Sequence, residues 1–270
     1  MSEKTPLSII IPAYNEEDRL SYTLDAVLDW SEKTVLFDIE LIVVDDGSLD
    51  RTREIVRQYM KKDARVRLIE QQHLGTVSAI ISGFKNARYS CIGSMEADCS
   101  VHPREFEQLF QYADDDTIAL GSRILRGDLP PIQGKPLFRR LLSWGMSRFF
   151  LLFFECRIYD PQSGFKLYKR DVIFKVLPML CLGHDGMKSA EILVKAYGLG
   201  FSIKEVPVHY CHNQNSRCVP KAKAEAVMIA LAALRALMCL WIQSYGDYRR
   251  GTLSRLPVRG GAMLRFIYKI

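Results

Sequence analysis

Two acidic side chains one residue apart, Glu96 and Asp98, are the first candidates for chemistry in this sequence. They follow a short apolar run, residues 91–93, that is typical of the end of a buried strand. In extended backbone, residues i and i+2 point to the same side, so the two carboxylates would repel each other unless a cation lay between them. Mg²⁺ is commonly held by one or two carboxylates together with water and phosphate. The pattern predicts a metal-dependent nucleotide site, although taken alone it is more often a solvated acidic loop.

Two other polar motifs also follow apolar runs that are rich in β-branched residues, at 7–11 and 39–44. The side chains in question are Pro12, Tyr14 and Glu16 after the first run, and Asp45 and Asp46 after the second. Along residues 1–121 such runs alternate with segments of helical periodicity. We expect strands at 7–11, 39–44, 66–69, 89–93 and 117–121, and helices at 16–30, 52–60, 76–88 and 103–112.

This alternation predicts an α/β fold with a mostly parallel sheet that is covered by helices on both faces. Ligands of such sheets bind beyond the carboxyl ends of the strands. All three polar motifs lie at such ends, so we expect them to meet at one rim. The sequence contains neither a P-loop nor a Gly-x-Gly-x-x-Gly turn after a strand, which argues against those two kinds of nucleotide site.

The charge of the 270-residue chain is divided unevenly. Residues 1–120 carry 13 Lys/Arg and 22 Asp/Glu, and residues 121–270 carry 24 and 9, which sum to the net charge of +6. A cationic second half favours an anionic partner there, which could be nucleic acid, a phosphorylated substrate or an anionic membrane; a basic surface without a partner is the alternative. The seven cysteines form no Cys-x-x-Cys pair, and we expect free thiols in a reducing compartment.

In this order, the motifs of residues 7–220 resemble those of glycosyltransferase family 2, and most closely its polyprenyl-phosphate (dolichyl-phosphate) mannose and glucose synthases. The matching segments are 10–16, 43–48 with Asp50 and Thr52, 96–98, 121–123, 160–168 and 205–208. The resemblance implies a GT-A (Rossmann-like) fold and an inverting transfer of a hexose from a nucleoside-diphosphate sugar, UDP-glucose or GDP-mannose, to a polyprenyl phosphate. The glucose branch is slightly favoured, by analogy only.

The resemblance also implies roles for individual residues. Glu96 and Asp98 would hold Mg²⁺ or Mn²⁺ on the donor diphosphate, and Asp98, Glu191 and Arg123 would be the catalytic residues. The residues implied to bind the nucleotide sugar are Pro12, Tyr14, Glu16, Asp45, Asp46, Ala97 and Arg217, and those implied to hold the acceptor phosphate are Arg123, Arg139 and Ser143. A solvated basic surface is the alternative for these arginines.

The acceptor defines two further hypotheses. A phosphate acceptor is already an anion and needs holding, whereas a hydroxyl acceptor needs a general base, for which Asp185 or Glu191 is the candidate. A catalytically weak nucleotide-sugar-binding protein is the third hypothesis. The motif departures that favour it are Glu96 in place of the family's first aspartate, and Val77 and Ile81 in a segment where the family has a glycine and a cation; that segment reads His73-Leu74-Gly75-Thr76-Val77 here. Lys221 is a rival to Arg217 for the diphosphate.

The remaining expectations concern a membrane. We predict a transferase domain at 1–220 and a hydrophobic helix with a basic tail at 221–270. Residues 139–155 combine an aromatic run with arginines and predict an interfacial helix, with a core helix as the alternative. Residues 226–243 contain one charge, Arg235, and are interpreted as interfacial in preference to a span or a core helix. The expected location is cytoplasmic, peripherally associated with the membrane, with no nucleic acid as partner.

Overall fold

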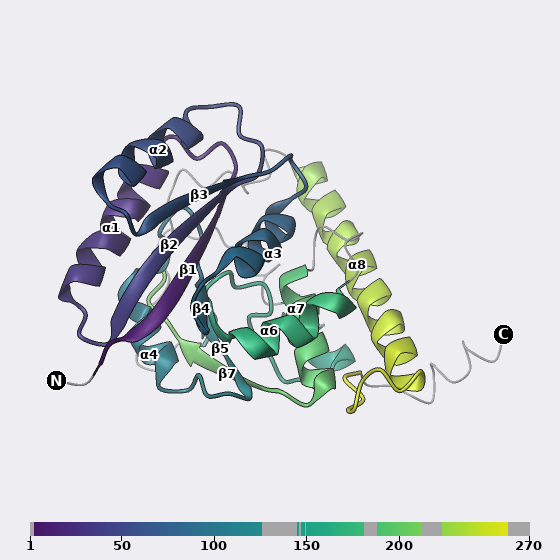
Figure 1. Ribbon diagram of the computed structural model, residues 1–270. Coiled ribbons are helices and arrows are strands. Elements are labelled where there is room, and N and C mark those ends of the chain that lie inside the picture. Colours follow the sequence, from purple (N-terminus) through teal and green to yellow (C-terminus); the bar gives the residue numbers. More distant parts are fainter. Residues whose placement is uncertain are drawn as a thin grey trace.

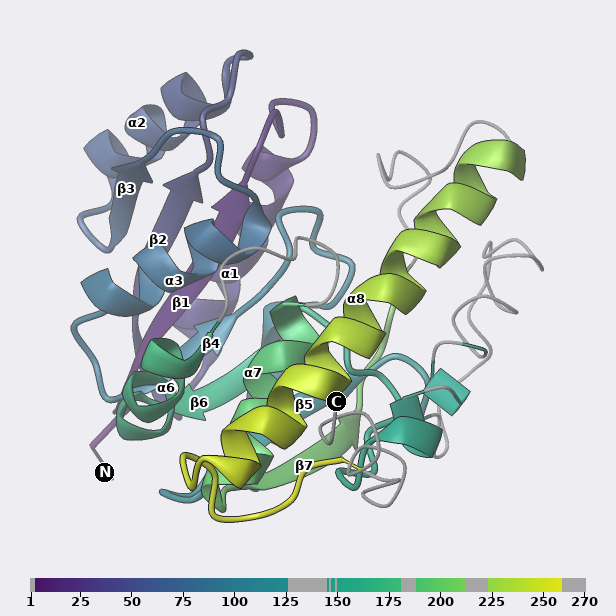
Figure 2. The same ribbon diagram turned by 90° about the vertical axis from the view of Figure 1, so that its right-hand side faces the viewer.

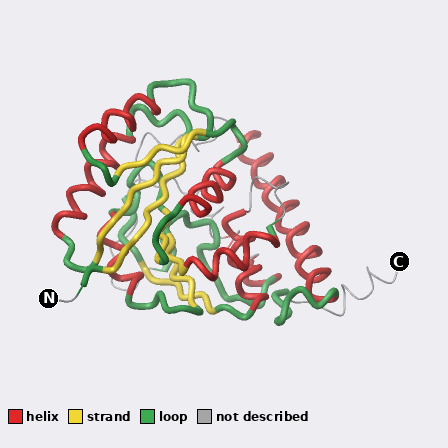
Figure 3. The backbone as a smooth tube through the Cα atoms, viewed as in Figure 1, coloured by secondary structure: helices red, strands yellow, loops and turns green. Residues whose placement is uncertain are grey.

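The computed structural model describes residues 3–125, 145, 147–148, 150–180, 188–211 and 223–258. Their strands form one seven-stranded sheet in the order β3-β2-β1-β4-β6-β5-β7 (Figures 1 and 3). The strands are β1 Thr5–Ala13, β2 Phe37–Asp45, β3 Val66–Glu70, β4 Cys91–Ser94, β5 Thr117–Ser122, β6 Lys166–Lys169 and β7 Ser202–Pro207. β6 is antiparallel to both of its neighbours, and the other pairs are parallel. The predicted fold, a mostly parallel α/β sheet, is confirmed.

Helices cover both faces of this sheet. They are α1 Leu20–Lys33, α2 Thr52–Lys62, α3 Thr76–Asn86, α4 Phe106–Phe110, α6 Arg170–Val176, α7 Lys188–Leu199 and α8 Lys223–Arg249, with 3-10 turns at Pro103–Glu105 and Leu177–Met179. Alternate residues of β1 enter two different cores: Ile9 and Ile11 pack with α1, α2 and α4, whereas Ile10 packs with α3, α6, α7 and α8. A central strand that is buried on both faces consists of consecutive apolar residues, and this pattern allows β1 to be predicted from the sequence.

Every strand and helix expected within residues 1–121 is present, with small differences at the ends. α1 begins at Leu20 and not at 16; the amides of Glu16 and Glu17 donate to the side-chain oxygens of Thr52, at the start of α2, and of Asp50, in the loop before it. Pro12 does not end β1, which continues to Ala13. Alternate residues of a strand direct their backbone groups toward the same neighbouring strand. The carbonyl of Ile10 accepts from Met95 N, on the β4 side, so the backbone nitrogen of Pro12 also faces that side. Because β4 ends at Ser94, the N–H that proline lacks has no strand partner to lose there.

Glu40 on β2 stabilises the sheet away from the polar motifs. This buried carboxylate accepts from Ser8 Oγ at 2.6 Å, from Arg88 N at 2.6 Å and from Arg67 Nη1 at 2.7 Å. Burial by itself would raise the pKa of Glu40, but these donors outweigh it and the pKa is lowered. A carboxyl whose pKa is lowered on folding stabilises the protein above its unfolded pKa, and that contribution is lost as the pH falls through the folded value.

We therefore expect Glu40→Gln to be less stable than the wild type at pH 7 by about 1–3 kcal/mol, because charge-assisted hydrogen bonds are lost. The difference should shrink as the pH falls through the lowered folded pKa of Glu40, where the wild-type carboxyl takes up a proton. Urea unfolding of both proteins between pH 3 and pH 7 measures this. A stability gap that is independent of pH would contradict the role given to the charge.

Within the predicted interfacial segment the structure describes residues 145, 147–148 and 150–155, and Phe153 packs on α8. Phe150 and Phe154 are fully buried and stack on each other with ring centroids 4.5 Å apart, and the Phe153 ring meets Trp241 edge-on at 5.5 Å. Leu152 is 65% exposed. The expectation that these aromatic rings enter a membrane is therefore wrong for Phe150 and Phe154, which face the protein interior.

α8 lies alongside α7, and its amino-terminal end extends beyond it (Figure 2). Leu237, Leu240 and Trp241 are buried in the core, whereas Leu234 and Arg235 are exposed. Among the described residues, no helix has both the length and the apolar character needed to cross a membrane. The carboxyl-terminal half of α8 is thus a packed core helix, and an interfacial role stays a prediction for its exposed side.

Candidate active site

The loops that follow β1, β2 and β4 meet at one edge of the sheet. Asn15 N donates to Ser48 Oγ at 2.9 Å, and Asn15 Oδ1 accepts from Leu49 N at 2.7 Å, which joins the first two loops. Asn15 adopts φ 55°, a left-handed conformation that asparagine tolerates. The third loop is joined to α1 because Thr23 Oγ1 donates to the carbonyl of Ala97 at 2.6 Å. The polar motifs thus share one rim.

Asp46, which is implied to bind the nucleotide sugar, anchors the loop that follows β3. Its side chain is 3% exposed. It accepts from Gln71 Nε2 and Leu74 N through Oδ1, at 2.6 and 3.0 Å, and from Gly75 N through Oδ2 at 2.9 Å. Asp45 is also buried and accepts from Ser48 N at 3.1 Å, while its Oδ1 has no hydrogen-bond partner among the described residues. Both aspartates are therefore buried and hold the backbone of the rim loops through hydrogen bonds.

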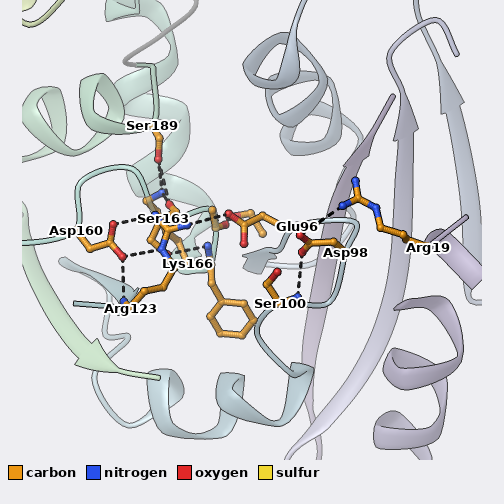
Figure 4. Close-up of polar contacts among 12 residues, drawn as sticks. Arg19, Glu96, Asp98, Ser100, Arg123, Asp160, Ser163, Lys166 and Ser189 are labelled. Atoms are coloured by element: carbon orange, nitrogen blue, oxygen red, sulfur yellow. Dashed lines mark hydrogen bonds and ion pairs between the residues drawn. The ribbon is translucent and has the colours of Figure 1, made fainter. Parts of the chain in front are cut away.

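Glu96 and Asp98 follow the end of β4, and their carboxylates have different partners. β4 ends at Ser94, and the chain turns at residues 97–98. Glu96 Oε1 lies 3.5 Å from Arg123 Nη1, whereas Asp98 accepts from Ser100 N at 3.0 Å and lies 3.8 Å from Arg19 Nη1 (Figure 4). The prediction that both carboxylates point to one side assumed extended backbone, whereas the strand ends at Ser94, and their common orientation stays a prediction.

Arg123 is fixed by a carboxylate to which sequence reasoning assigned no role, Asp160. The Nε and Nη2 of Arg123 donate to the two oxygens of Asp160 at 2.8 and 2.9 Å, and the backbone N of Arg123 donates at 2.9 Å. Asp160 is in turn held by Glu205, whose carboxylate accepts from the amides of Tyr159 and Asp160 at 2.8 Å each. The signal for Asp160 was its place at the start of the 160–168 motif.

Lys166 is a second cation that sequence reasoning left without a role. It is 2% exposed, donates to Ser189 Oγ at 2.5 Å and also contacts the carbonyl oxygen of Ser163 (Figure 4). Burial lowers the pKa of Lys166 to about 7, against the opposing pull of Asp160 and Glu96. Because β6 pairs with β4, Lys166 lies opposite Ser94, two residues before Glu96. Through its contacts with Ser163 and Ser189, the lysine connects the loop before β6 to α7.

Arg19 was also missed, and it joins two acids of the predicted site. Its Nε and Nη2 donate to Glu16 at 2.8 and 2.7 Å, and its Nη1 reaches Asp98. The three side chains are 10%, 14% and 17% exposed for Arg19, Glu16 and Asp98. Helical spacing drew attention to the apolar face of this segment, and nothing local indicated that an arginine at its start would turn toward Asp98.

The acidic pair has the chemistry expected of a divalent-metal site. Burial raises the pKa of Glu96, and the nearby charges of Asp98 and Asp160 act in the same direction against Arg123. Negative charge is therefore crowded around a half-buried carboxylate, and a cation would relieve it. The described residues hold no cluster of three or more acidic, His or Cys ligands, so an ion here would need phosphate or water to complete its shell. Glu96 and Asp98 offer two hard oxygen ligands, which fits Mg²⁺ or Mn²⁺.

Several predicted site residues lie outside the described part of the chain: Arg139, Ser143, Asp185, Arg217 and Lys221. Their roles stay predictions. Glu191 is on α7 and is 5% exposed, two residues after the Ser189 that contacts Lys166. Pro12 and Ala97 are at the rim, and Ala97 is buried.

The family described as Glycosyl transferase family 2 matches residues 8–177. The chain belongs to glycosyltransferase family 2. Similar family members include dolichyl-phosphate beta-glucosyltransferases of Drosophila melanogaster, 33% identical over 81% of this chain and 71% of that protein, and of Dictyostelium discoideum, 29% identical over 87% and 76%. A Trichomonas vaginalis protein of the same activity is 34% identical, and this chain spans 65% of its length.

Solved structures of other glycosyltransferases share the fold. The mannosyl-3-phosphoglycerate synthase of Rubrobacter xylanophilus superposes with a TM-score of 0.64 and 16% identity, over 95% of this chain and 78% of that one. The glucosyl-3-phosphoglycerate synthase of Mycobacterium tuberculosis, solved in complex with Mg²⁺ and UDP, gives 0.60 and 17%, over 88% and 79%. This glycosyltransferase therefore has the GT-A-like fold of those enzymes, and at such identity the likeness concerns the fold alone.

Proposed function

We propose that this family 2 glycosyltransferase transfers glucose from UDP-glucose to a polyprenyl phosphate of the dolichyl type, with inversion at the anomeric carbon. The observation that carries the proposal is the shared activity of its relatives, which are named dolichyl-phosphate beta-glucosyltransferases at 29–34% identity. The geometry supports it, because Glu96, one of two acids suited to a metal-bound diphosphate, lies 3.5 Å from the fixed guanidinium of Arg123.

In this proposal the rim residues bind the donor. Tyr14 and Glu16 lie at the nucleoside end, and Glu96 and Asp98 hold the metal ion, which neutralises charge on the departing nucleoside diphosphate. Arg123 is kept in one orientation by Asp160. Its remaining nitrogen, Nη1, faces Glu96, on the side where an acceptor phosphate would approach. Arginine suits this task because its charge is permanent and its donors are fixed in a plane.

If the acceptor is a phosphate, the transfer does not require a general base. The phosphate oxygen is already a nucleophile and needs to be oriented. The alternative, a hydroxyl acceptor, needs a base within hydrogen-bond reach. Glu191 is 5% exposed, so in this arrangement its carboxylate is covered. If a hydroxyl is the acceptor, replacing Glu191 or Asp185 should abolish turnover while donor binding persists, and unchanged turnover in both variants would exclude that alternative.

Because the proposed acceptor lipid stays in a bilayer, we also propose that the protein associates peripherally with the cytoplasmic face of a membrane. The excess of basic residues after residue 120 supports this, since each exposed cation adds roughly 1 kcal/mol near an anionic surface. Sedimentation with vesicles that contain or lack anionic lipid measures it. Binding that is independent of lipid charge would contradict the electrostatic part of the proposal.

The transfer itself is tested with purified protein, vesicles, Mn²⁺ and radiolabelled UDP- and GDP-sugars, with and without polyprenyl phosphate. We expect label to enter the lipid phase only from UDP-glucose and only when polyprenyl phosphate is present. Transfer from GDP-mannose would correct the donor and keep the acceptor. Label that stays in the aqueous phase with every donor would overturn the acceptor, and donor affinity by calorimetry would then separate a hydroxyl-directed enzyme from a binding protein.

A further inference from the structure

His73 lies against Tyr14 at the rim of the site, where the chain departs from the family's motif. The two rings stack with centroids 4.0 Å apart and planes inclined by 20°. Tyr14 is 39% exposed and the His73 side chain is 56% exposed. Exposed aromatic rings are the kind of surface on which planar bases stack.

The imidazole is held in this position from below. His73 Nδ1 lies 2.8 Å from Asp46 Oδ2 and 3.1 Å from the Asp46 carbonyl oxygen, and the same carboxylate accepts from the amides of Leu74 and Gly75. Displacing His73 would disturb these bonds to a buried acid. The ring therefore forms a fixed part of the surface and does not act as a removable cover over Tyr14.

The backbone beneath the stack allows this close approach only because residue 47 is glycine. Gly47 has φ +79°, and a Cβ added there would come within 2.8 Å of His73 N. The Asp46-Gly47 turn and the His73 loop are consequently packed against each other. The Nε2 atom of His73 has no hydrogen-bond partner among the described residues, so it is available to a ribose hydroxyl or to a polar atom of a base.

We propose that His73 is a donor-binding residue: its imidazole, fixed against Tyr14, extends the stack on which the nucleobase of the sugar nucleotide lies. This inference rests on the proposed function, since it assigns a contact to the nucleoside half of the donor. The charged diphosphate half, at Glu96 and Asp98, is separate from it. Changes at His73 should therefore affect a nucleotide but not an inorganic diphosphate.

The experiment measures the affinity of the full chain for UDP and for pyrophosphate by calorimetry with Mn²⁺ present. His73→Phe keeps a ring but loses the Nδ1 donor, whereas His73→Asn keeps a donor toward Asp46 but loses the ring. We expect His73→Asn and His73→Ala to bind UDP about tenfold more weakly, and His73→Phe to stay within about threefold of the wild type. Pyrophosphate affinity should not change in any of them.

Leu74→Ala is the matched control, because Leu74 lies in the same loop, is 59% exposed and takes no part in the stack. It should bind UDP like the wild type. Equal losses of UDP and pyrophosphate affinity in His73→Ala would show that the histidine only supports the loop, and tighter UDP binding would show that it covers Tyr14; either result overturns the inference. If the wild type transfers sugar but His73→Ala binds UDP normally, the inference fails and the proposed function stands. A wild type that binds no nucleotide overturns both.

Discussion

Asp98→Asn is expected to lower sugar transfer by about a thousandfold. The reason is charge: the amide keeps the oxygen that accepts from Ser100 N, so the turn at 97–98 should persist, but a negative ligand for the metal is lost. A metal that stabilises the leaving diphosphate contributes several kcal/mol, and roughly 4 kcal/mol corresponds to three factors of ten in rate. The measurement is the initial rate of lipid labelling as a function of Mn²⁺ concentration.

The matched control for this variant is Asp115→Asn. Asp115 is an aspartate outside the site whose side chain is 94% exposed, and its ion pair with Lys169 is a surface contact of small energy. Its replacement should leave the rate and the Mn²⁺ dependence unchanged. If Asp98→Asn keeps more than about a tenth of the wild-type rate with the same Mn²⁺ dependence, Asp98 does not hold the metal, and the acidic pair returns to its simpler interpretation as a solvated loop.

Asp247→Asn is expected to destabilise the protein strongly. Lys195 on α7 is completely buried, and its ammonium contacts Asp247 Oδ2 on α8, while Arg250 Nη2 donates to Oδ1 at 2.6 Å. Removing the carboxylate charge leaves a buried ammonium without its counter-ion, which costs about 3–5 kcal/mol. For a chain of this size that lowers Tm by roughly 10 °C.

The double variant Lys195→Met, Asp247→Asn tests the cause. Methionine has nearly the volume of lysine and no charge, so the double variant should recover most of the lost stability, as buried pairs replaced by apolar groups often do. Arg250 is 66% exposed and needs no compensation. Should the single and double variants unfold at the same temperature, the loss would come from α8 packing and not from the unpaired charge.

The amino-terminal half of the fold follows from local sequence. Apolar β-branched runs locate β1 and β2, and amphipathic spacing locates α1 and α2, because burial on both sheet faces or on one helix face imposes its own period. The same reasoning places the acidic pair at a strand end and correctly brings three motifs to one rim. The order of the motifs indicates a glycosyltransferase, which hydrophobic periodicity alone does not indicate.

Tertiary structure alone decides how charged residues far apart in the sequence are paired. β6 lies antiparallel between β4 and β5, which places Lys166 close to Glu96. The same arrangement brings Asp160 into contact with Arg123, although the two residues are 37 positions apart in the sequence. Such partners depend on sheet order, which local patterns do not encode. The same holds for Phe150 and Phe154: their aromatic run is compatible with a membrane or a core, and only packing against α8 and its neighbours puts these two rings inside the protein.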